Sequence, residues 1–165
     1  LYVSLAAPRL AGRLRRLVYL AAFVPSHGLN LYDLMPAHAA TYFRDTTTDH
    51  GTITQPFTRV RDLYLSTLDI DAARAAYAQM IPQNATVFDT RTDTAAFDTL
   101  LASETVGVSY IDVTADRVMG PAGWYACFAD RLGPARYVQV CGQSHEITYT
   151  APDLAAAAII EAGRD

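Results

Sequence analysis

Two residues in the C-terminal third of the chain could together move a proton. Asp116 stands in the polar run Thr114-Ala-Asp-Arg117, and His145 ends the run Gly142-Gln-Ser-His145. A carboxylate beside an imidazole fixes the ring tautomer and stabilises the imidazolium, which leaves the other ring nitrogen free to accept a proton from a nucleophile. An Asp–His pair is therefore half of a proton relay, and a nucleophile would complete it.

The segments around these residues predict how the two could meet. Residues 107–113 and 136–141 are β-rich, and between them Pro121 can open a helix that runs to Leu132. A strand, a helix and a second strand predict two adjacent parallel strands, with both polar runs at the carboxyl ends. Ligands bind at that edge of open α/β sheets, so we expect Asp116 and His145 to be neighbours.

The remaining segments predict a mixed α/β chain. Residues 16–23 are almost continuously apolar, as expected of a strand covered on both faces. We expect helices over residues 1–7, ended by Pro8, and over residues 152–163. Between residues 29 and 102 the pattern changes to short helical pieces without a strand, of which residues 69–80 are the clearest helix. This region predicts a helical insertion above the carboxyl edge of the sheet.

Composition excludes several classes of function. The net charge is −4 and all 13 basic residues are Arg, which argues against a nucleic-acid partner. The longest apolar run, residues 17–24, is far shorter than the roughly 20 residues of a membrane helix, so no membrane partner is expected. Cys127 and Cys141 predict reduced, buried thiols and a cytoplasmic setting.

The order of these elements resembles the C-terminal part of an α/β-hydrolase, in the capped branch that includes small esterases and hydroxynitrile lyases. The resemblance rests on four runs of sequence and a following proline: residues 17–25, Ile81-Pro-Gln83, residues 114–117, and residues 142–145 followed by Pro152. It implies about three parallel strands with flanking helices. Residues 1–28 and 103–165 would form the core, and residues 29–102 a helical cap.

The resemblance implies a serine hydrolase that acts on a small ester or amide without a cofactor. Asp116 would be the acid and His145 the general base, and a serine on a G-x-S-x-G elbow would be the nucleophile. No such motif occurs in the chain, so we expect the serine shortly upstream of Leu1. Residues 1–165 alone would then have essentially no esterase activity, because the oxyanion-hole donors would be missing too. Candidate pocket residues are Phe23, Leu31, Phe57, Met80 and Met119.

Two other functions remain open. A lyase of the same fold would use the histidine to take a proton from a cyanohydrin-like hydroxyl. Such lyases usually need a basic residue near the pocket, and the chain has no Lys. The third possibility is a non-catalytic protein that binds a small molecule, or an inactive remnant of an enzyme, and the missing nucleophile favours it.

Other polar residues are weaker candidates. Asp112 is the second choice for the acid, but its place within a strand points it at a packed face. His27, His38 and His50 lack the close helical spacing of a zinc site, so no metal is expected. Ser4 and Ser109 do not stand on glycine-flanked elbows, and we interpret both as structural.

The apolar strand predicted over residues 17–23 bears on self-association. If strands that precede it are absent, it becomes an exposed apolar edge that invites pairing with another chain. The isolated 165-residue chain is therefore expected to form a homodimer through this edge, to aggregate or to be poorly stable.

Overall fold

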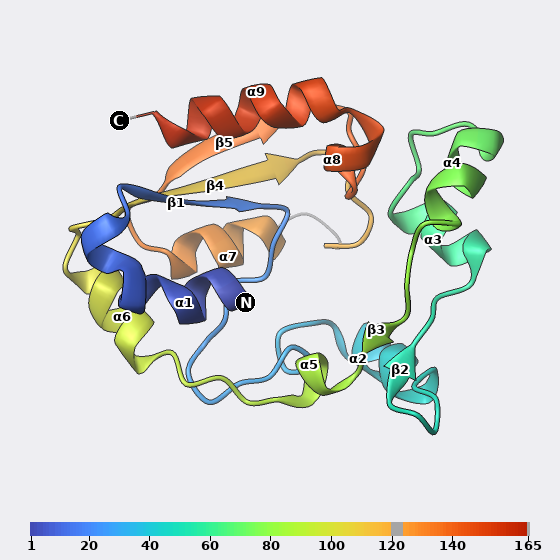
Figure 1. The fold of residues 1–165 in the computed structure, drawn as a ribbon, viewed down its shortest axis with the longest axis horizontal. Helices are drawn as coiled ribbons and strands as arrows, with labels where there is room; N and C mark the ends of the chain where they lie inside the picture. The colour runs from blue at the N-terminus through green and yellow to red at the C-terminus, as the bar shows by residue number, and fades with distance from the viewer. Residues whose placement is uncertain (120–123, 165) are drawn as a thin grey trace.

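A three-stranded parallel sheet organises the fold and lies in the upper part of the view in Figure 1. The computed structural model describes residues 1–119 and 124–164. The strand order is β1-β4-β5, and both neighbouring pairs are parallel. The elements of this core are α1 (Tyr2–Leu10), the 3₁₀ helix η1 (Ala11–Arg13), β1 (Arg16–Leu20), β4 (Gly107–Val113), α7 (Trp124–Arg131), β5 (Arg136–Val140), α8 (Ile147–Thr150) and α9 (Pro152–Gly163). This arrangement confirms the predicted fold class.

The helix α9 covers one face of the sheet (Figure 1). Its buried side chains are Ala155, Ala158 and Ala162, which lie on one stripe of the helix. They pack against apolar residues of the strands, including Ile111 and Val113, which are fully buried. Because alanine is small, the helix axis can approach the sheet closely.

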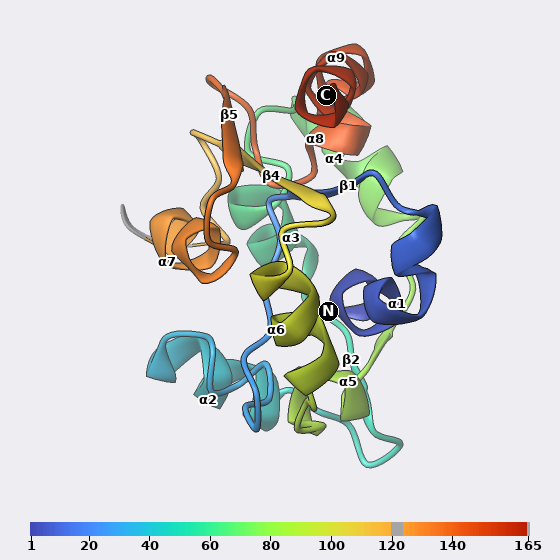
Figure 2. The same ribbon diagram turned by 90° about the vertical axis from the view of Figure 1, so that its left-hand side faces the viewer.

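The opposite face of the sheet packs on α7, α1 and α6 (Ala95–Ala102). The main apolar core lies here, with Tyr19 and Tyr110 from the strands, Phe128 from α7 and Phe97 from α6. Figure 2 shows α1 and α6 side by side below the sheet. Although α6 falls within the predicted cap range of residues 29–102, its buried side chains belong to this core. The division into core and cap therefore stays a prediction.

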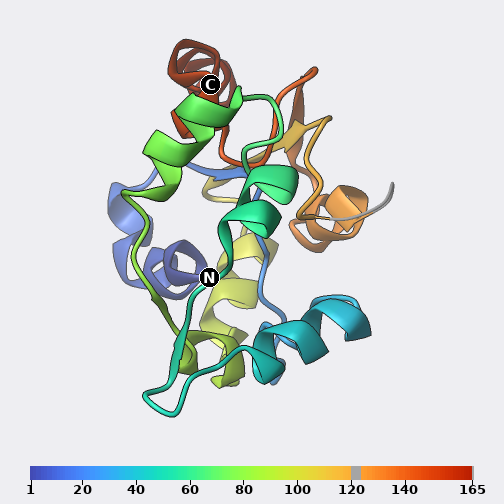
Figure 3. The same ribbon diagram turned by 90° about the vertical axis from the view of Figure 1, so that its right-hand side faces the viewer.

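The chain between β1 and α6 extends around the carboxyl ends of the strands (Figure 3). Its elements are α2 (Ala37–Asp45), β2 (Thr52–Ile53), α3 (Phe57–Leu63), α4 (Ile70–Tyr77), β3 (Gln83–Asn84) and α5 (Thr86–Asp89). Two apolar clusters hold it together, one around Phe43 and Ile53 and the other between α3 and α4. The short antiparallel pair of β2 and β3 corrects the prediction that this region has no strand.

Most of the predicted elements have nearly the predicted bounds. The strand β4 and the helix α9 match their predictions residue for residue, and β5 ends one residue early at Val140. The helix α4 begins after Asp69, whose carboxylate accepts hydrogen bonds from the backbone N–H groups of residues 71 and 72. It ends at Tyr77, three residues short of the prediction. The predicted start of α7 at Pro121 lies outside the described residues.

Three predictions of local structure need correction. The strand β1 ends at Leu20 rather than at residue 23, because Ala21 has a φ of 45° and turns the chain out of the sheet. Pro8 does not end α1, which continues to Leu10 with its inner side packed on α6. Cys127 and Cys141 are free but exposed rather than buried.

Within the described part of the sheet, β1 pairs only with β4 and is an edge strand. The expected self-association depends on this edge position of β1. The homodimer itself stays a prediction. Of the helices in residues 1–119 and 124–164, none is long and apolar enough to cross a membrane.

Alkaline pH is expected to destabilise the fold through its buried tyrosines. Burial raises the pKa of Tyr110 above its ordinary value of 10.0, and it also raises the pKa of Tyr19 and Tyr64. These phenols ionise near pH 10 in the unfolded chain but stay protonated in the folded chain. Their contribution to stability is therefore complete below pH 10 and is lost as pH rises toward the folded-state pKa.

Urea unfolding at several pH values checks this expectation. Above pH 10 the free energy of unfolding should fall, with each such tyrosine contributing up to about 1.4 kcal/mol per pH unit. The Tyr110→Phe variant should show a shallower fall than the unmodified protein, even though it loses the hydrogen bond from the Tyr110 hydroxyl to the Ala22 carbonyl. Two parallel curves would contradict the expectation.

Candidate active site

The loops after β4 and β5 are tied together at the carboxyl edge of the sheet. The backbone N–H of Gly142 donates to the Thr114 hydroxyl at 2.8 Å, and the N–H of Ala115 donates to the Gln143 carbonyl at 3.1 Å. Gly142 has a φ of 73°, in the left-handed region that glycine adopts without strain. The adjacent parallel strands thus hold the two loops in a fixed relation.

This arrangement brings Asp116 and His145 into direct contact. His145 Nδ1 lies 2.6 Å from Asp116 Oδ2. The other carboxylate oxygen, Oδ1, accepts hydrogen bonds from the backbone N–H groups of Val118 at 2.6 Å and Met119 at 3.1 Å. The Asp116 side chain is fully buried, whereas 18% of the His145 side chain is exposed.

The geometry determines what this pair can do. A carboxylate held by two backbone donors cannot rotate freely, so its Oδ2 offers a fixed acceptor to the imidazole. With the Nδ1 hydrogen donated to Asp116, Nε2 of His145 is left as a base. The pair can therefore take a proton from a nearby hydroxyl and return it to a leaving group.

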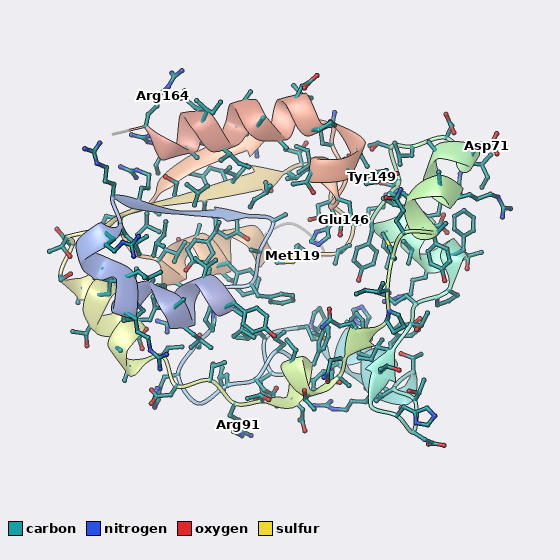
Figure 4. All side chains as sticks on the ribbon, viewed as in Figure 1. Asp71, Arg91, Met119, Glu146, Tyr149 and Arg164 are labelled. Carbon is teal, nitrogen blue, oxygen red and sulfur yellow. The ribbon has the colours of Figure 1, made fainter. Side chains whose placement is uncertain are left out.

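The segment after α3 packs directly on the histidine loop. The ring of Tyr64 meets the His145 ring edge to face, with the ring centroids 5.3 Å apart. The Tyr64 carbonyl accepts the Glu146 N–H at 3.2 Å, and the hydroxyls of Thr67 and Ser144 are 3.0 Å apart. Tyr149 of α8 also contacts the chain after α4, because its hydroxyl accepts from the Gln79 amide at 3.0 Å (Figure 4). The segment after α3 thus contacts three consecutive residues that include the histidine.

A cavity of about 510 Å³ opens beside His145. This volume falls within the range of small-molecule sites. Most of the side chains around it are apolar or aromatic, and most come from the region between β1 and α6. The lining comprises Phe23, Met35, Ala39, Phe43, Ile53, Thr54, Gln55, Val60, Tyr64, Tyr77, Ala78, Met80, Ile81, Gln83, Phe88, Val118 and His145.

Of the five pocket residues named from the sequence, Phe23 and Met80 lie on this cavity. The structure does not place Leu31, Phe57 or Met119 on its wall. Leu31 is buried within the apolar cluster that contains α2. The Phe57 ring packs on Tyr77 of α4, and Met119 is fully buried in the main core.

Sequence reasoning missed several residues of the site. Gln55, Tyr64 and Tyr77 line the cavity, and Tyr64 touches the histidine. These residues stand in and around helices of only seven or eight residues. Such helices have about two turns, and their apolar stripes are too short to show which side faces a cavity. The residue type of Tyr64 is the one feature that could have pointed to a site, and the chain has nine other tyrosines with the same feature.

The competing polar residues have other partners. Asp112, the second choice for the acid, accepts hydrogen bonds from the Tyr137 hydroxyl at 2.6 Å and from the Gln139 amide at 2.9 Å. Ser4 is bonded to the Tyr19 hydroxyl, and Ser109 donates to the Ala162 carbonyl; both serines are fully buried. Among the described residues, no group of three His, Cys, Asp or Glu side chains could hold a metal ion.

Comparisons with known proteins agree with this architecture. No family model and no curated protein sequence matches the chain. Among solved structures, it is similar to an extracellular α/β-hydrolase from a Paenibacillus species, which shares structural and functional homology with the tobacco salicylic acid binding protein 2. The sequence identity is 28% and the TM-score is 0.88, over 99% of this chain and 67% of that one.

Two further structures show the same fold at lower identity. The pyrethroid hydrolase PytH is 19% identical with a TM-score of 0.68, over 96% of this chain and 64% of that chain. The methylesterase MES16 from Arabidopsis is 12% identical with a TM-score of 0.67, over 98% of this chain and 64% of that chain. The chain has the α/β-hydrolase fold. It spans about two thirds of the length of these enzymes, which are esterases and hydrolases.

Proposed function

We propose that residues 1–165 supply the acid and the base of a serine hydrolase that cleaves small carboxylic esters or amides. The observation that carries the proposal is the 2.6 Å contact between buried Asp116 and His145, with the histidine on the wall of an apolar cavity. Hydrolases and esterases among the similar structures support the same class. The nucleophile would be a serine on a G-x-S-x-G elbow, a motif that these residues do not contain.

The reaction would proceed through an acyl-enzyme. The serine oxygen attacks the ester carbonyl carbon while Nε2 of His145 takes the hydroxyl proton. The tetrahedral intermediate then collapses, and His145 gives that proton to the departing alkoxide. A water molecule next attacks the acyl carbon, with His145 again as base, and the carboxylic acid and serine are released. Asp116 stays ionised throughout and stabilises the imidazolium.

The cavity indicates the kind of ester. Its wall is mostly apolar, so burial of an alkyl or aryl group of the substrate would supply binding free energy. Its volume suits a small ester rather than a polymer. A cytoplasmic setting stays a prediction, since both cysteines are free but the similar Paenibacillus hydrolase is extracellular.

A reactive phosphonate tests the proposal on the protein encoded by the whole reading frame that contains residues 1–165. We expect hydrolysis of p-nitrophenyl esters, loss of that activity on treatment with the phosphonate, and a single labelled serine within a G-x-S-x-G sequence. Mass spectrometry of the labelled protein identifies the site.

The isolated 165-residue chain is the matched control and should neither hydrolyse the esters nor take up the phosphonate. A whole protein that binds these esters without cleaving or labelling would instead be a non-catalytic binder, which contradicts the proposal.

A further inference from the structure

The side chains of Arg59, Gln55 and Tyr64 form a row of hydrogen bonds that ends on the cavity wall. Arg59 Nε lies 3.0 Å from Gln55 Oε1, and Gln55 Nε2 lies 2.7 Å from the Tyr64 hydroxyl oxygen. The guanidinium of Arg59 also sits over the Tyr42 ring, 3.8 Å from its centroid, which fixes its position. Gln55 and Tyr64 both line the cavity.

The chemistry of arginine sets the direction of every bond in this chain. A guanidinium N–H can only donate, so the atom of Gln55 that faces Arg59 must be the amide oxygen. The amide NH₂ of Gln55 therefore faces Tyr64 and donates to it. The Tyr64 oxygen is thus the acceptor in that bond, and the hydroxyl hydrogen of Tyr64 is not used in it.

The hydroxyl of the neighbouring Tyr77 differs from that of Tyr64, because it acts as a donor within the protein. Its hydroxyl donates to the backbone carbonyl of Gln55 at 2.7 Å, so its hydrogen is already used. Among the described residues, nothing accepts the hydrogen of the Tyr64 hydroxyl. Burial raises the pKa of Tyr64, so this hydroxyl stays protonated at neutral pH and above.

We propose that the Tyr64 hydroxyl donates a hydrogen bond to the substrate, and that the preferred esters carry a second acceptor, such as a ketone or ether oxygen, apart from the scissile group. The Tyr64 ring lies against the His145 ring, so the acceptor would sit close to the reacting centre. Tyr64 is half-buried on the wall of a mostly apolar cavity, so a hydrogen bond from its hydroxyl to a bound ligand would be largely shielded from water and would add to binding. The inference rests on the proposed function insofar as it calls the ligand an ester.

A pair of unreactive ligands tests the inference without any turnover. Acetophenone carries a carbonyl oxygen, and α-methylstyrene has a CH₂ group in the same place. The readout is the ratio of their dissociation constants, measured by calorimetry near neutral pH on the whole protein carrying His145→Ala. Adding Tyr64→Phe should lower the relative preference for acetophenone by about 3- to 10-fold.

Two further variants separate a lost donor from a damaged cavity. Gln55→Glu keeps the Tyr64 hydroxyl but turns its partner into an acceptor, which takes up the hydroxyl hydrogen. It should reduce the preference as Tyr64→Phe does. Tyr77→Phe removes a hydroxyl from the same wall whose hydrogen is already bonded, so the preference should not change.

The inference is overturned if Tyr64→Phe leaves the ratio unchanged, if Tyr77→Phe lowers it equally, or if acetophenone does not bind. Because no bond is cleaved, the ratio can support a donor at Tyr64 even if the phosphonate experiment rejects the hydrolase. Conversely, if the whole protein hydrolyses esters but Tyr64→Phe does not change the ratio of dissociation constants, the proposed function stands and only the role of Tyr64 is rejected.

Discussion

Replacing His145 with alanine is expected to lower kcat of the whole protein for p-nitrophenyl esters by a factor on the order of 10⁶. In the proposed reaction Nε2 of this residue takes the proton of the nucleophile and later gives it to the leaving group, so both chemical steps lose their base and acid. Steady-state kinetics with an activated ester measures the change, and thermal unfolding reports whether the variant is folded.

His50→Ala is the matched control for this loss. His50 is an exposed residue in the loop between α2 and β2, away from the lining of the cavity. We expect its replacement to leave kcat within about twofold of the unmodified protein, as for most surface substitutions. If both histidine variants kept similar activity, His145 would not be the base.

Replacing Asp116 with asparagine is expected to lower kcat by about 10⁴-fold with little change in shape. The new amide oxygen can still accept from the backbone N–H groups of Val118 and Met119, which now bond to Oδ1 at 2.6 and 3.1 Å. The amide NH₂ then faces His145 Nδ1, so that nitrogen must become an acceptor. The ring is left with its hydrogen on Nε2, which is the wrong tautomer for a base.

Asp112→Asn is the control for this substitution, because Asp112 is a buried carboxylate of the same strand and loop region but contacts Tyr137 and Gln139. It should change stability more than activity. Kinetics and urea unfolding are measured on both variants. A loss of kcat that is larger for Asp112→Asn than for Asp116→Asn would reverse the assignment of the acid.

Tyr64 joins the segment after α3 to the proposed catalytic pair. Its ring lies on His145, its carbonyl holds the Glu146 N–H, and its hydroxyl faces Gln55. Displacement of α3 would therefore disturb both the histidine and the proposed contact of the Tyr64 hydroxyl with a ligand.

Local patterns in the amino-acid sequence are enough to predict the sheet and the contact between Asp116 and His145. The runs at residues 107–113 and 136–141 are strongly β-rich, and a parallel strand-helix-strand unit has only one edge at which the loops after its strands can meet. For that reason the contact of Asp116 with His145 could be expected from residues 29 positions apart in the chain. The helix over residues 152–163 was equally clear, since Pro152 opens it and its alanines form a continuous apolar stripe.

The residues that surround the cavity are set by packing between distant segments of the chain. Leu31 and Met119 look like pocket residues in the sequence, but packing buries both within apolar clusters. Gln55 and Tyr64 reach the site because short helices and loops of the region after β1 fold back over the strand ends. Their orientation depends on contacts between segments distant in sequence, such as the bond from Glu146 to Tyr64, and such contacts leave no periodic pattern in the chain.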